Sequence, residues 1–400
     1  MSNIIPKMVA VSISAFVLAP SAVAQTADNA KDVVFSSGDP APTLRSKDGS
    51  AELNLTGRLF LDWSTGQDDN PANDFSGTQL RAAWFGIQGK VMDNIKYNFV
   101  ADFSNNDVNV KDAFVQFDQG NWSYIVGQSR VPNSLEWNSP VSQTTFMERG
   151  AFKSAFGLGR AMGVRAATGG DNWGFKVGVF QGTDIFSSAT KEGFIASVRA
   201  SYGGKIKNGT WMIGASSRYK DMKSKTINYK AKAITNQSMV LSNFASLASK
   251  ETLYAAEAAI TVGSLFATAE YAFTDAKDAV ALNTDANFNG GYVEIGYILT
   301  GESRPLNIRA GAWERPLVDK PIGKGGTGMW MLSARFDTVD LNDNRALGGK
   351  QNNYVAGLSW YLTRYIRAIL NYGHSTVKNR GILGTSNTAD VVGLRMNIDW

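Results

Sequence analysis

The stretch LNLTGRLFLDW, residues 53–63, decides the fold class of this 400-residue chain. Leucines and a closing tryptophan occupy alternate positions, and Asn54, Arg58 and Asp62 stand among them. A period of two places successive side chains on opposite faces, so the stretch is predicted to be a β-strand with one apolar and one polar face. Such a strand fits a soluble β-sandwich as well as a membrane barrel, and the rest of the chain distinguishes the two.

The same alternation recurs along most of the chain. The clearest further segments are 95–103, 173–179, 194–202, 211–219, 265–273, 330–336, 354–362, 366–372 and 392–400. Tyrosines and tryptophans stand at the ends of many of them, which is where a membrane β-barrel carries its interfacial girdles. The pattern therefore predicts an all-β chain that forms a transmembrane antiparallel β-barrel.

Strand counting gives sixteen good segments and one doubtful segment, Leu306 to Trp313. An even number of strands returns both termini to the periplasmic side. Residues 304–327 are therefore predicted to be an extended periplasmic connection, although Leu306 and Ile308 continue the alternation. Residues 78–89 resist assignment because Trp84 and Phe85 fall on opposite faces, so the inward side cannot be chosen.

The connections between the segments are of two kinds that alternate along the chain. Short turns are predicted at residues 90–93, 169–171, 203–208 and 363–364. Long polar connections are predicted at residues 64–77, 131–160, 182–192, 221–250, 275–289 and 375–387. Short periplasmic turns that alternate with long outer loops are typical of an outer-membrane barrel, whereas a soluble sandwich has no reason to keep this rhythm.

The first residues have the features of a signal peptide. Lys7 supplies positive charge, residues 8–19 are mostly apolar, and Ala22-Val23-Ala24 fits the small-residue cleavage rule. No later stretch approaches the roughly 18 apolar residues of a membrane helix. The chain is therefore predicted to consist of a signal peptide (1–24), an irregular leader (25–50) and a barrel domain in the bacterial outer membrane (51–400).

The composition argues against several classes of site. The chain has no cysteine and a single histidine, His374, so a Cys–His pair or a transition-metal cluster cannot be built. The formal net charge is +5, a modest excess. The mean hydropathy of −0.18 suits a barrel that is apolar on one face alone. We expect no enzyme activity, no cofactor, no metal and no nucleic-acid partner.

One connection, RVPNSLEWNSPVSQTTFMERGAFKSAFGLGR (130–160), differs from the others. It has far more than the usual loop length, and it carries too much apolar bulk for a solvated linker. Leu135, Trp137 and the phenylalanines stand among charged residues, which include Glu136, Glu148, Arg149, Lys153 and Arg160. The stretch is predicted to be the third outer loop, residues 131–160, folded into the lumen. The alternative is a large surface loop packed on itself.

With these residues in view, the chain resembles the phosphate-selective porin family of the porin O and P type. The resemblance spans about residues 53–400. It rests on GRLFLDW (57–63), VGQSRVPNSLEW (126–137), TTFMERG (144–150) and SWYLTRYIRAILNY (359–372). The resemblance implies a sixteen-stranded barrel in contact with outer-membrane lipid, a homotrimeric assembly, and a third loop that narrows the pore.

The polar faces of the predicted strands carry charges of both signs. The predicted lumen-lining arginines are Arg58, Arg165, Arg199, Arg218, Arg335, Arg367 and Arg395, and the acids on the same faces are Asp62, Asp102, Glu257, Glu270, Glu294 and Asp399. The phosphate-specific relatives line the pore with a ladder of arginines and gather lysines near its mouths. Here the cations outnumber the acids only slightly, so this chain departs from that pattern.

Selectivity in such a pore comes from a few charges at a constriction. We therefore predict that Arg149, Lys153 and Arg160 form the anion-binding constriction, because guanidinium and ammonium groups bind oxyanions. Glu136 and Glu148 are expected to pair with cations and to hold the shape of the loop.

Three functions stay open at this point. The first is passive diffusion of small anions, such as phosphate, or of other polar solutes. The second is a channel for another nutrient, a sugar or an organic acid, with Trp137 and the phenylalanines of the third loop as a stacking surface. The third is a structural or receptor barrel that does not conduct.

Overall fold

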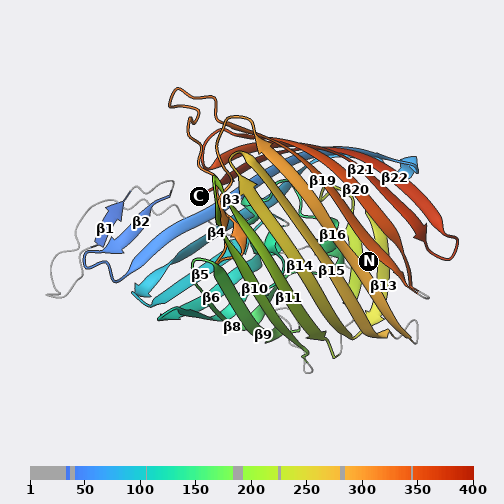
Figure 1. Cartoon of the computed structure of the whole chain (residues 1–400), viewed down its shortest axis with the longest axis horizontal. Coiled ribbons are helices and arrows are strands. Elements are labelled where there is room, and N and C mark those ends of the chain that lie inside the picture. Colours follow the sequence, from blue (N-terminus) through green and yellow to red (C-terminus); the bar gives the residue numbers. More distant parts are fainter. Residues whose placement is uncertain are drawn as a thin grey trace, which may run out of the picture.

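The computed structural model describes residues 33–36, 41–104, 106–182, 192–223, 227–279, 284–343 and 346–400. In these residues, sixteen strands form one closed antiparallel barrel (Figure 1). Each barrel strand pairs with the next one along the chain, and β22 pairs with β3 to close the ring. The predicted barrel and its strand number are confirmed.

The barrel strands differ in length. Their bounds are β3 (Glu52–Asp68), β4 (Phe75–Met92), β5 (Ile95–Asp102), β6 (Asn109–Gln119), β7 (Trp122–Arg130), β8 (Arg160–Gly169), β9 (Trp173–Gln181), β10 (Phe194–Ile206), β11 (Gly209–Asp221), β14 (Lys250–Val262), β15 (Leu265–Ala279), β16 (Thr284–Ile298), β19 (Met329–Asp343), β20 (Ala346–Tyr361), β21 (Ile366–Arg380) and β22 (Thr385–Asp399). Strands β5 to β9 have 8–11 residues, whereas the others have 13–18.

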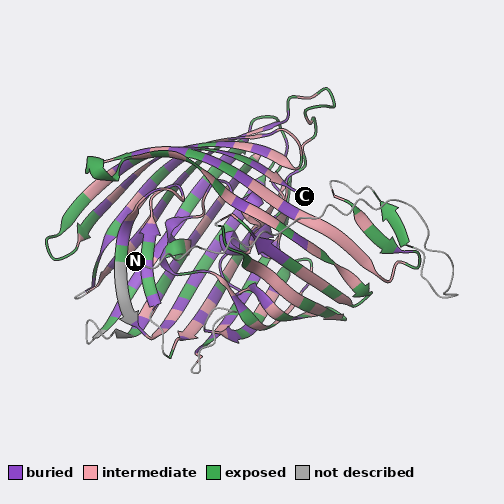
Figure 2. Ribbon diagram, turned by 180° about the vertical axis from the view of Figure 1, so that it is seen from behind, coloured by how far each residue is buried: buried purple, intermediate pink, exposed green. Residues whose placement is uncertain are grey.

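Burial alternates along the strands in step with the side-chain direction (Figure 2). The exposed side chains include many large apolar residues, such as Val126, Val179 and Tyr254. The buried inward side chains include charged ones, such as Arg199 and Glu257. A polar interior with an apolar exterior reverses the order of a soluble protein and is what a membrane barrel requires.

The helices of the described residues are all short. None of them is long and apolar enough to cross a membrane.

Three of the six predicted long connections are shorter than expected. β3 and β4 continue to within six residues of each other, so the prediction of a loop at 64–77 was wrong. The same correction applies at 275–289 and 375–387, where strands occupy most of the stretch. Beyond the membrane both faces of a strand meet water, so the apolar alternation ends there while backbone pairing continues. Residues 183–191 lie outside the described part of the chain.

A β-bulge explains why residues 78–89 could not be assigned a face. Phe60 pairs with Ala82 and Leu61 pairs with Leu80, so Arg81 is the extra residue. An extra residue reverses the alternation at that point. Trp84 consequently lies on the inner side beside Arg58. The expectation that 304–327 is not a barrel strand is confirmed, because β16 pairs directly with β19.

The described part of the leader forms a hairpin. Strands β1 (Val33–Ser36) and β2 (Thr43–Ser46) pair with each other, and β2 pairs with the start of β3. The hairpin projects outside the barrel (Figures 1 and 2). The expectation of an irregular leader was therefore wrong for these residues. The predicted signal peptide, residues 1–24, lies outside the described residues.

Three segments that are not barrel strands carry buried apolar side chains. The first is 131–159, with the helices α1 (Leu135–Asn138) and α2 (Ala151–Ala155) and the 3₁₀ turn η2 (Val141–Gln143). The other 3₁₀ turn of the described residues, η1 (Pro71–Asn73), lies between β3 and β4 and does not belong to this segment. The second is the hairpin of β12 (Ile227–Lys232) and β13 (Val240–Ala248). The third is 299–328, with β17 (Leu306–Asn307) and β18 (Ala312–Trp313).

These three segments pack against one another and against inward residues of the wall. Phe156 of the loop, Tyr229 of the hairpin and Phe288 of the wall share one buried cluster. Leu135 of the loop and Trp313 of the 299–328 segment share another. The predicted long outer loop at 221–250 is thus mostly a hairpin with its own apolar contacts.

Candidate functional site

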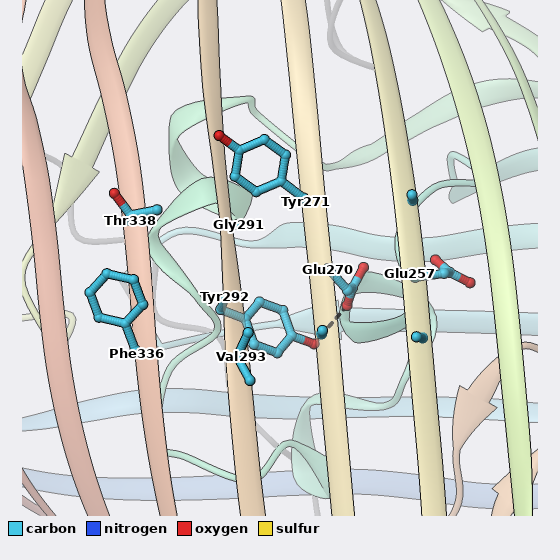
Figure 3. Close-up of a pocket in the computed structure, with 11 residues that line it drawn as sticks. Glu257, Glu270, Tyr271, Gly291, Tyr292, Val293, Phe336 and Thr338 are labelled. Carbon is cyan, nitrogen blue, oxygen red and sulfur yellow. Dashed lines mark hydrogen bonds between the residues drawn. The ribbon is translucent and has the colours of Figure 1, made fainter.

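The start of helix α1 is held by a carboxylate of the barrel wall. Glu270 accepts hydrogen bonds from the backbone N–H groups of Leu135, at 2.9 Å, and Glu136, at 2.7 Å. The Tyr292 hydroxyl donates to the same carboxylate at 2.7 Å (Figure 3). Free N–H groups at the start of a helix attract negative charge, so this acid fixes the loop and is not available to repel anions.

Arg335 joins the loop to the wall through two carboxylates. Its Nη2 lies 2.7 Å from Glu136 of the loop and 2.7 Å from Glu294 of the wall. The guanidinium also stacks over Phe146, 4.6 Å from the ring centroid. Glu136 thus pairs with a cation, and the charge of Arg335 is fully compensated.

Glu148 spans two distant strands. It accepts hydrogen bonds from Arg81 of β4, at 2.8 and 3.0 Å, and from Arg395 of β22, at 2.7 Å. Arg395 also pairs with Asp62 at 2.7 Å. Glu148 therefore ties the loop to both sides of the seam where the barrel closes.

Loop carbonyl groups are bound by other wall arginines. Arg367 donates to the carbonyls of Thr144 and Thr145, each at 2.6 Å. Arg218 donates to the Phe156 carbonyl at 2.6 Å and pairs with Glu251. Of the predicted lumen-lining arginines, those paired with a carboxylate are Arg199, Arg218, Arg335 and Arg395.

The 299–328 segment binds the loop as well. Arg304 donates to the Gln143 carbonyl at 2.7 Å and to the Thr145 hydroxyl at 2.9 Å. The backbone N–H of Trp313 donates to the Ser139 hydroxyl at 2.9 Å. The analysis of the sequence missed Arg304, because a connection outside the strand pattern offers no face from which its direction can be assigned.

Arg149 and Lys153 form no ion pair with a carboxylate among the described residues. Arg149 donates to the carbonyls of Glu136, at 3.0 Å, and Ser139, at 2.8 Å. Its guanidinium lies 5.1 Å from the centroid of the Trp137 ring, and the Lys153 ammonium lies 5.3 Å from it. Carbonyl oxygens and ring faces orient these cations without cancelling their charge.

Arg160 has a different position from the predicted one. It is the first residue of β8 and not part of the inward loop. It makes a bidentate pair with Asp112, both contacts at 2.9 Å, and lies between two rings, 5.4 Å from the centroid of Trp84 and 5.7 Å from that of Trp137.

Arg58 has hydrogen-bonding capacity to spare. Its guanidinium lies 4.6 Å from the centroid of Trp84. Its Nε and Nη1 atoms are buried and make no hydrogen bond, and the indole N–H groups of Trp84 and Trp137 are in the same condition. We call the group of Arg58, Arg130, Arg149, Lys153 and Arg160 around these two rings the cationic cluster. Among described residues, Asp112 is the one carboxylate in an ion pair with it.

Arg130 and Arg165 lie next to each other on the inner wall. Arg130, at the end of β7, donates to the Asn138 carbonyl at 2.6 Å, and the sequence pattern did not single it out. Arg165, predicted to line the lumen, points toward the Arg130 carbonyl at 3.4 Å and also has an Nε atom without a partner. The other inward strands differ, because most of their arginines are each paired with an acid and Arg367 is held by loop carbonyls; the paired ones are Arg199, Arg218, Arg335 and Arg395.

The phenylalanines of the loop are not available for stacking. Phe146, Phe152 and Phe156 are each at most 2% exposed. Trp137 is 5% exposed and is surrounded by four cations. His374 pairs with Asp390 at 3.0 Å. No group of three or more potential metal ligands occurs among the described residues.

Comparison with known proteins identifies the family of the chain. A sequence model of the family described as phosphate-selective porin O and P matches residues 53–400. The chain belongs to this family. An uncharacterized protein of Caulobacter vibrioides is 29% identical over 414 residues, which cover 96% of this chain and 83% of that protein. The chain is thus an outer-membrane porin.

Solved structures share its fold. OmpT, an outer membrane protein of Vibrio cholerae, matches with a TM-score of 0.57 and 12% identity over 88% of this porin and 98% of that chain. The anion-selective porin of Comamonas acidovorans matches with a TM-score of 0.55 and 12% identity over 87% and 100%. The outer membrane channel DcaP of Acinetobacter baumannii matches with a TM-score of 0.55 and 14% identity over 89% and 99%.

Proposed function

We propose that this porin gives passive diffusion of small anions, phosphate-like oxyanions among them, and that the cationic cluster is its constriction. The observation that carries the proposal is the charge imbalance of the cluster: five cations have one ion-paired carboxylate among the described residues. The acids of the opposite wall are occupied by arginines and loop N–H groups. A passing anion therefore meets uncompensated positive charge on one side.

The hydrogen-bonding groups of the cluster favour oxyanions over neutral solutes. Arginine and indole N–H groups are donors without acceptor capacity. Arg58, Trp84 and Trp137 have buried donors without a partner. A deprotonated oxyanion supplies acceptors only, and its charge-assisted hydrogen bonds are the stronger kind. The bonds remain few, which suits a channel that has to release the ion again.

We further propose a homotrimeric assembly. The support is the family and a neighbour of the same fold, OmpT of Vibrio cholerae, that has a trimer form. A channel for sugars is less well supported, because sugar binding needs free aromatic faces and hydrogen-bond acceptors. The faces of Trp84 and Trp137 carry cations instead.

Charge reversal at two cations of the loop tests the proposal. Arg149→Glu with Lys153→Glu is expected to lower the chloride-to-potassium permeability ratio about tenfold, which corresponds to roughly 1.4 kcal/mol. A unit charge about 4 Å from an ion contributes roughly 1 kcal/mol in water and several times more at an effective dielectric near 20, so two reversals suffice. Reversal potentials across a KCl gradient in planar bilayers measure the ratio.

The control carries the same charge change away from the constriction. Lys205→Glu with Lys207→Glu alters two exposed lysines at the β10–β11 turn and is expected to leave the ratio almost unchanged. Equal reversal potentials for the wild type and the Arg149–Lys153 variant would remove the cluster from the selectivity mechanism.

The anion preference is also expected to fall between pH 7 and pH 9. Burial lowers the pKa of Lys153 to about 8, and repulsion by Arg149, Arg81 and Arg160 acts in the same direction, whereas Glu148 opposes it. A lysine loses its charge as the pH rises through its pKa, so the cluster has one cation fewer at pH 9. Reversal potentials at both pH values measure this, and Lys153→Arg is expected to reduce the change. A wild-type porin whose reversal potential does not change over this pH range would contradict the prediction.

A further inference from the structure

A groove lies on the membrane-facing surface of strands β14, β15, β16 and β19. Its volume is about 450 Å³. A cavity of roughly 150 Å³ already holds one benzene molecule, so this groove has room for a segment of a hydrocarbon chain. We call it the outer groove, and its outward lining residues include Ala256, Ala258, Ala269, Tyr271, Gly291 and Phe336 (Figure 3).

The outer groove is on the lipid side of the barrel wall. The strand register pairs Ala258 with Ala269 and Ala269 with Val293, so these three side chains point to one face. Val293 is 58% exposed on that face. Glu270, the next residue after Ala269, points to the other face, where its carboxylate binds the start of α1. The wall therefore separates the groove from the ion path.

Small side chains and two displaced aromatic rings produce the groove. The three alanines leave the outer surface of β14 and β15 low. The Tyr271 ring lies over Gly291 of β16, where an added Cβ would be 2.7 Å from a ring carbon. The Phe336 ring packs against Tyr354 of β20, with the two ring centroids 5.2 Å apart. Both rings thus lean away from the alanines, and a hollow remains in the apolar belt.

The outer groove lies in the extracellular half of the membrane belt. A two-residue turn, residues 263–264, joins β14 to β15, and the short turns of such barrels are periplasmic. The outward residues of β15 are apolar or aromatic from Leu265 to Phe273, and Asp275 is the first charged one. Tyr271 lies near the upper end of this run, and its hydroxyl donates to Asn289 at 2.8 Å. A tyrosine whose hydroxyl has a polar partner marks the level of the lipid head groups.

We propose that the outer groove binds one acyl chain of an outer-leaflet lipid, with the lipid head group beside Tyr271 and Asn289. Lipid surrounds the apolar exterior of a membrane barrel, so acyl chains are present at the groove. A pocket that is apolar along its length and polar at one end orients a ligand with the same arrangement of groups. The site is separate from the proposed anion path and does not depend on it.

A second copy of the chain fits the outer groove less well than an acyl chain does. The outside of a closed barrel is convex, so two barrel walls touch at their most prominent side chains and leave a hollow empty. An empty hollow loses the dispersion contacts of the atoms that line it. An acyl chain is thin and flexible, so it fills the hollow and keeps these contacts.

A photoreactive lipid tests the site. The porin is reconstituted in phosphatidylcholine vesicles that contain a phosphatidylcholine with a diazirine halfway along one acyl chain, and peptide mass spectrometry locates the adducts after irradiation. Adducts on Val293, Phe336 and Thr338 are expected to be about fivefold more frequent than adducts on Ile213 and Leu332. Ile213 and Leu332 are 51% and 52% exposed and do not line the groove, so they report ordinary lipid contact.

A variant with a filled groove provides the second measurement. Ala258→Phe with Ala269→Phe covers the floor of the groove, and a cross-strand aromatic pair is compatible with the sheet. The adducts on Val293, Phe336 and Thr338 are expected to fall to the frequency found on Ile213 and Leu332.

The matched control makes the same substitutions in another cross-strand alanine pair of the outer surface. Ala200→Phe with Ala215→Phe lies on β10 and β11, outside the groove, and is expected to keep the wild-type adduct pattern.

The wild-type porin alone can refute the proposal. Equal adduct frequencies inside and outside the groove would mean that lipid has no preferred position there. A groove without adducts beside a labelled Ile213 and Leu332 would mean that another protein surface covers it, which also overturns the lipid site. Undiminished groove adducts in the Ala258–Ala269 variant would show that the hollow does not cause the preference. None of these outcomes bears on the anion preference, which reversal potentials measure separately.

Discussion

Replacement of residues 133–157 by a short Gly-Ser linker is expected to raise the single-channel conductance several-fold while the barrel still forms. The ends of the loop already meet, because the Val131 N–H donates to the Gly159 carbonyl at 3.2 Å and Arg130 pairs with Arg160. A linker therefore closes the gap without moving β7 or β8. The barrel strands pair with one another and not with the loop, so their backbone hydrogen bonds survive.

The conductance of the shortened porin has an upper bound. The β12–β13 hairpin and the 299–328 segment remain in place, so the pore stays narrower than an empty sixteen-stranded barrel. The arginines and acids that held the loop are then exposed to water in the wider lumen, where screening weakens their effect on ions. The anion preference is expected to fall as the conductance rises.

Conductance in planar bilayers at 1 M KCl measures the effect, and well-defined single-channel current steps show that the barrel still forms. The control shortens the exposed turn at 381–384, whose Ile382 is 95% exposed, and is expected to leave conductance unchanged. A conductance equal to that of the wild type would mean that residues 133–157 do not restrict the ion path.

The strand pattern could be predicted from the sequence because the barrel obeys one rule along its whole membrane-spanning height. Lipid on one face and water on the other impose a period of two, as in residues 53–63. The rule fails where its cause is absent. Above the membrane both faces are wet, and β3 continued to Asp68 unrecognised. Arg81 is an extra residue that shifts the alternation, and nothing in the local sequence indicates that a β-bulge occurs there.

The candidate site was predictable in part for a similar reason. Apolar bulk without alternation identified the third loop, and its charged residues were the natural candidates for the pore. Sequence could not say which cations are free, because pairing depends on contacts between distant segments. Arg335 and Arg58 have equivalent positions in the alternating pattern. In the structure, Arg335 lies between two carboxylates, whereas Arg58 has donors without a partner.

The inward position of the β12–β13 hairpin could not be predicted. Its residues stood in a stretch assigned to a polar outer loop. The position depends on Tyr229, which is fully buried against Phe156 and Phe288, so a few aromatic contacts turn an external loop into an internal one. A short apolar cluster inside a polar loop is the signal that could have identified this folding-in.

Arg335→Met is expected to lower the stability of the folded porin by about 3 kcal/mol, near the lower end of the cost of breaking a buried ion pair. The Arg335 side chain is 2% exposed, and its partners Glu136 and Glu294 are 5% and 3% exposed. Methionine preserves most of the apolar contact but leaves two carboxylates without this cation. Glu294 keeps Arg304 at 3.6 Å, which reduces the loss, whereas Glu136 keeps, among the described residues, only the Gly150 N–H at 3.0 Å as a hydrogen-bond donor.

The midpoint of thermal unfolding in detergent, followed by circular dichroism, measures the change at one scan rate for all variants. Arg335→Met with Glu136→Gln is expected to recover about half of the loss, because the unpaired charge is removed along with its partner. Arg199→Met breaks another wall pair, with Glu257, that does not touch the third loop. Both single variants are expected to lose stability, but only Arg335→Met is expected to add current noise, because it alone loosens the loop. A quiet, fully stable Arg335→Met channel would show that Arg335 does not hold the loop in place.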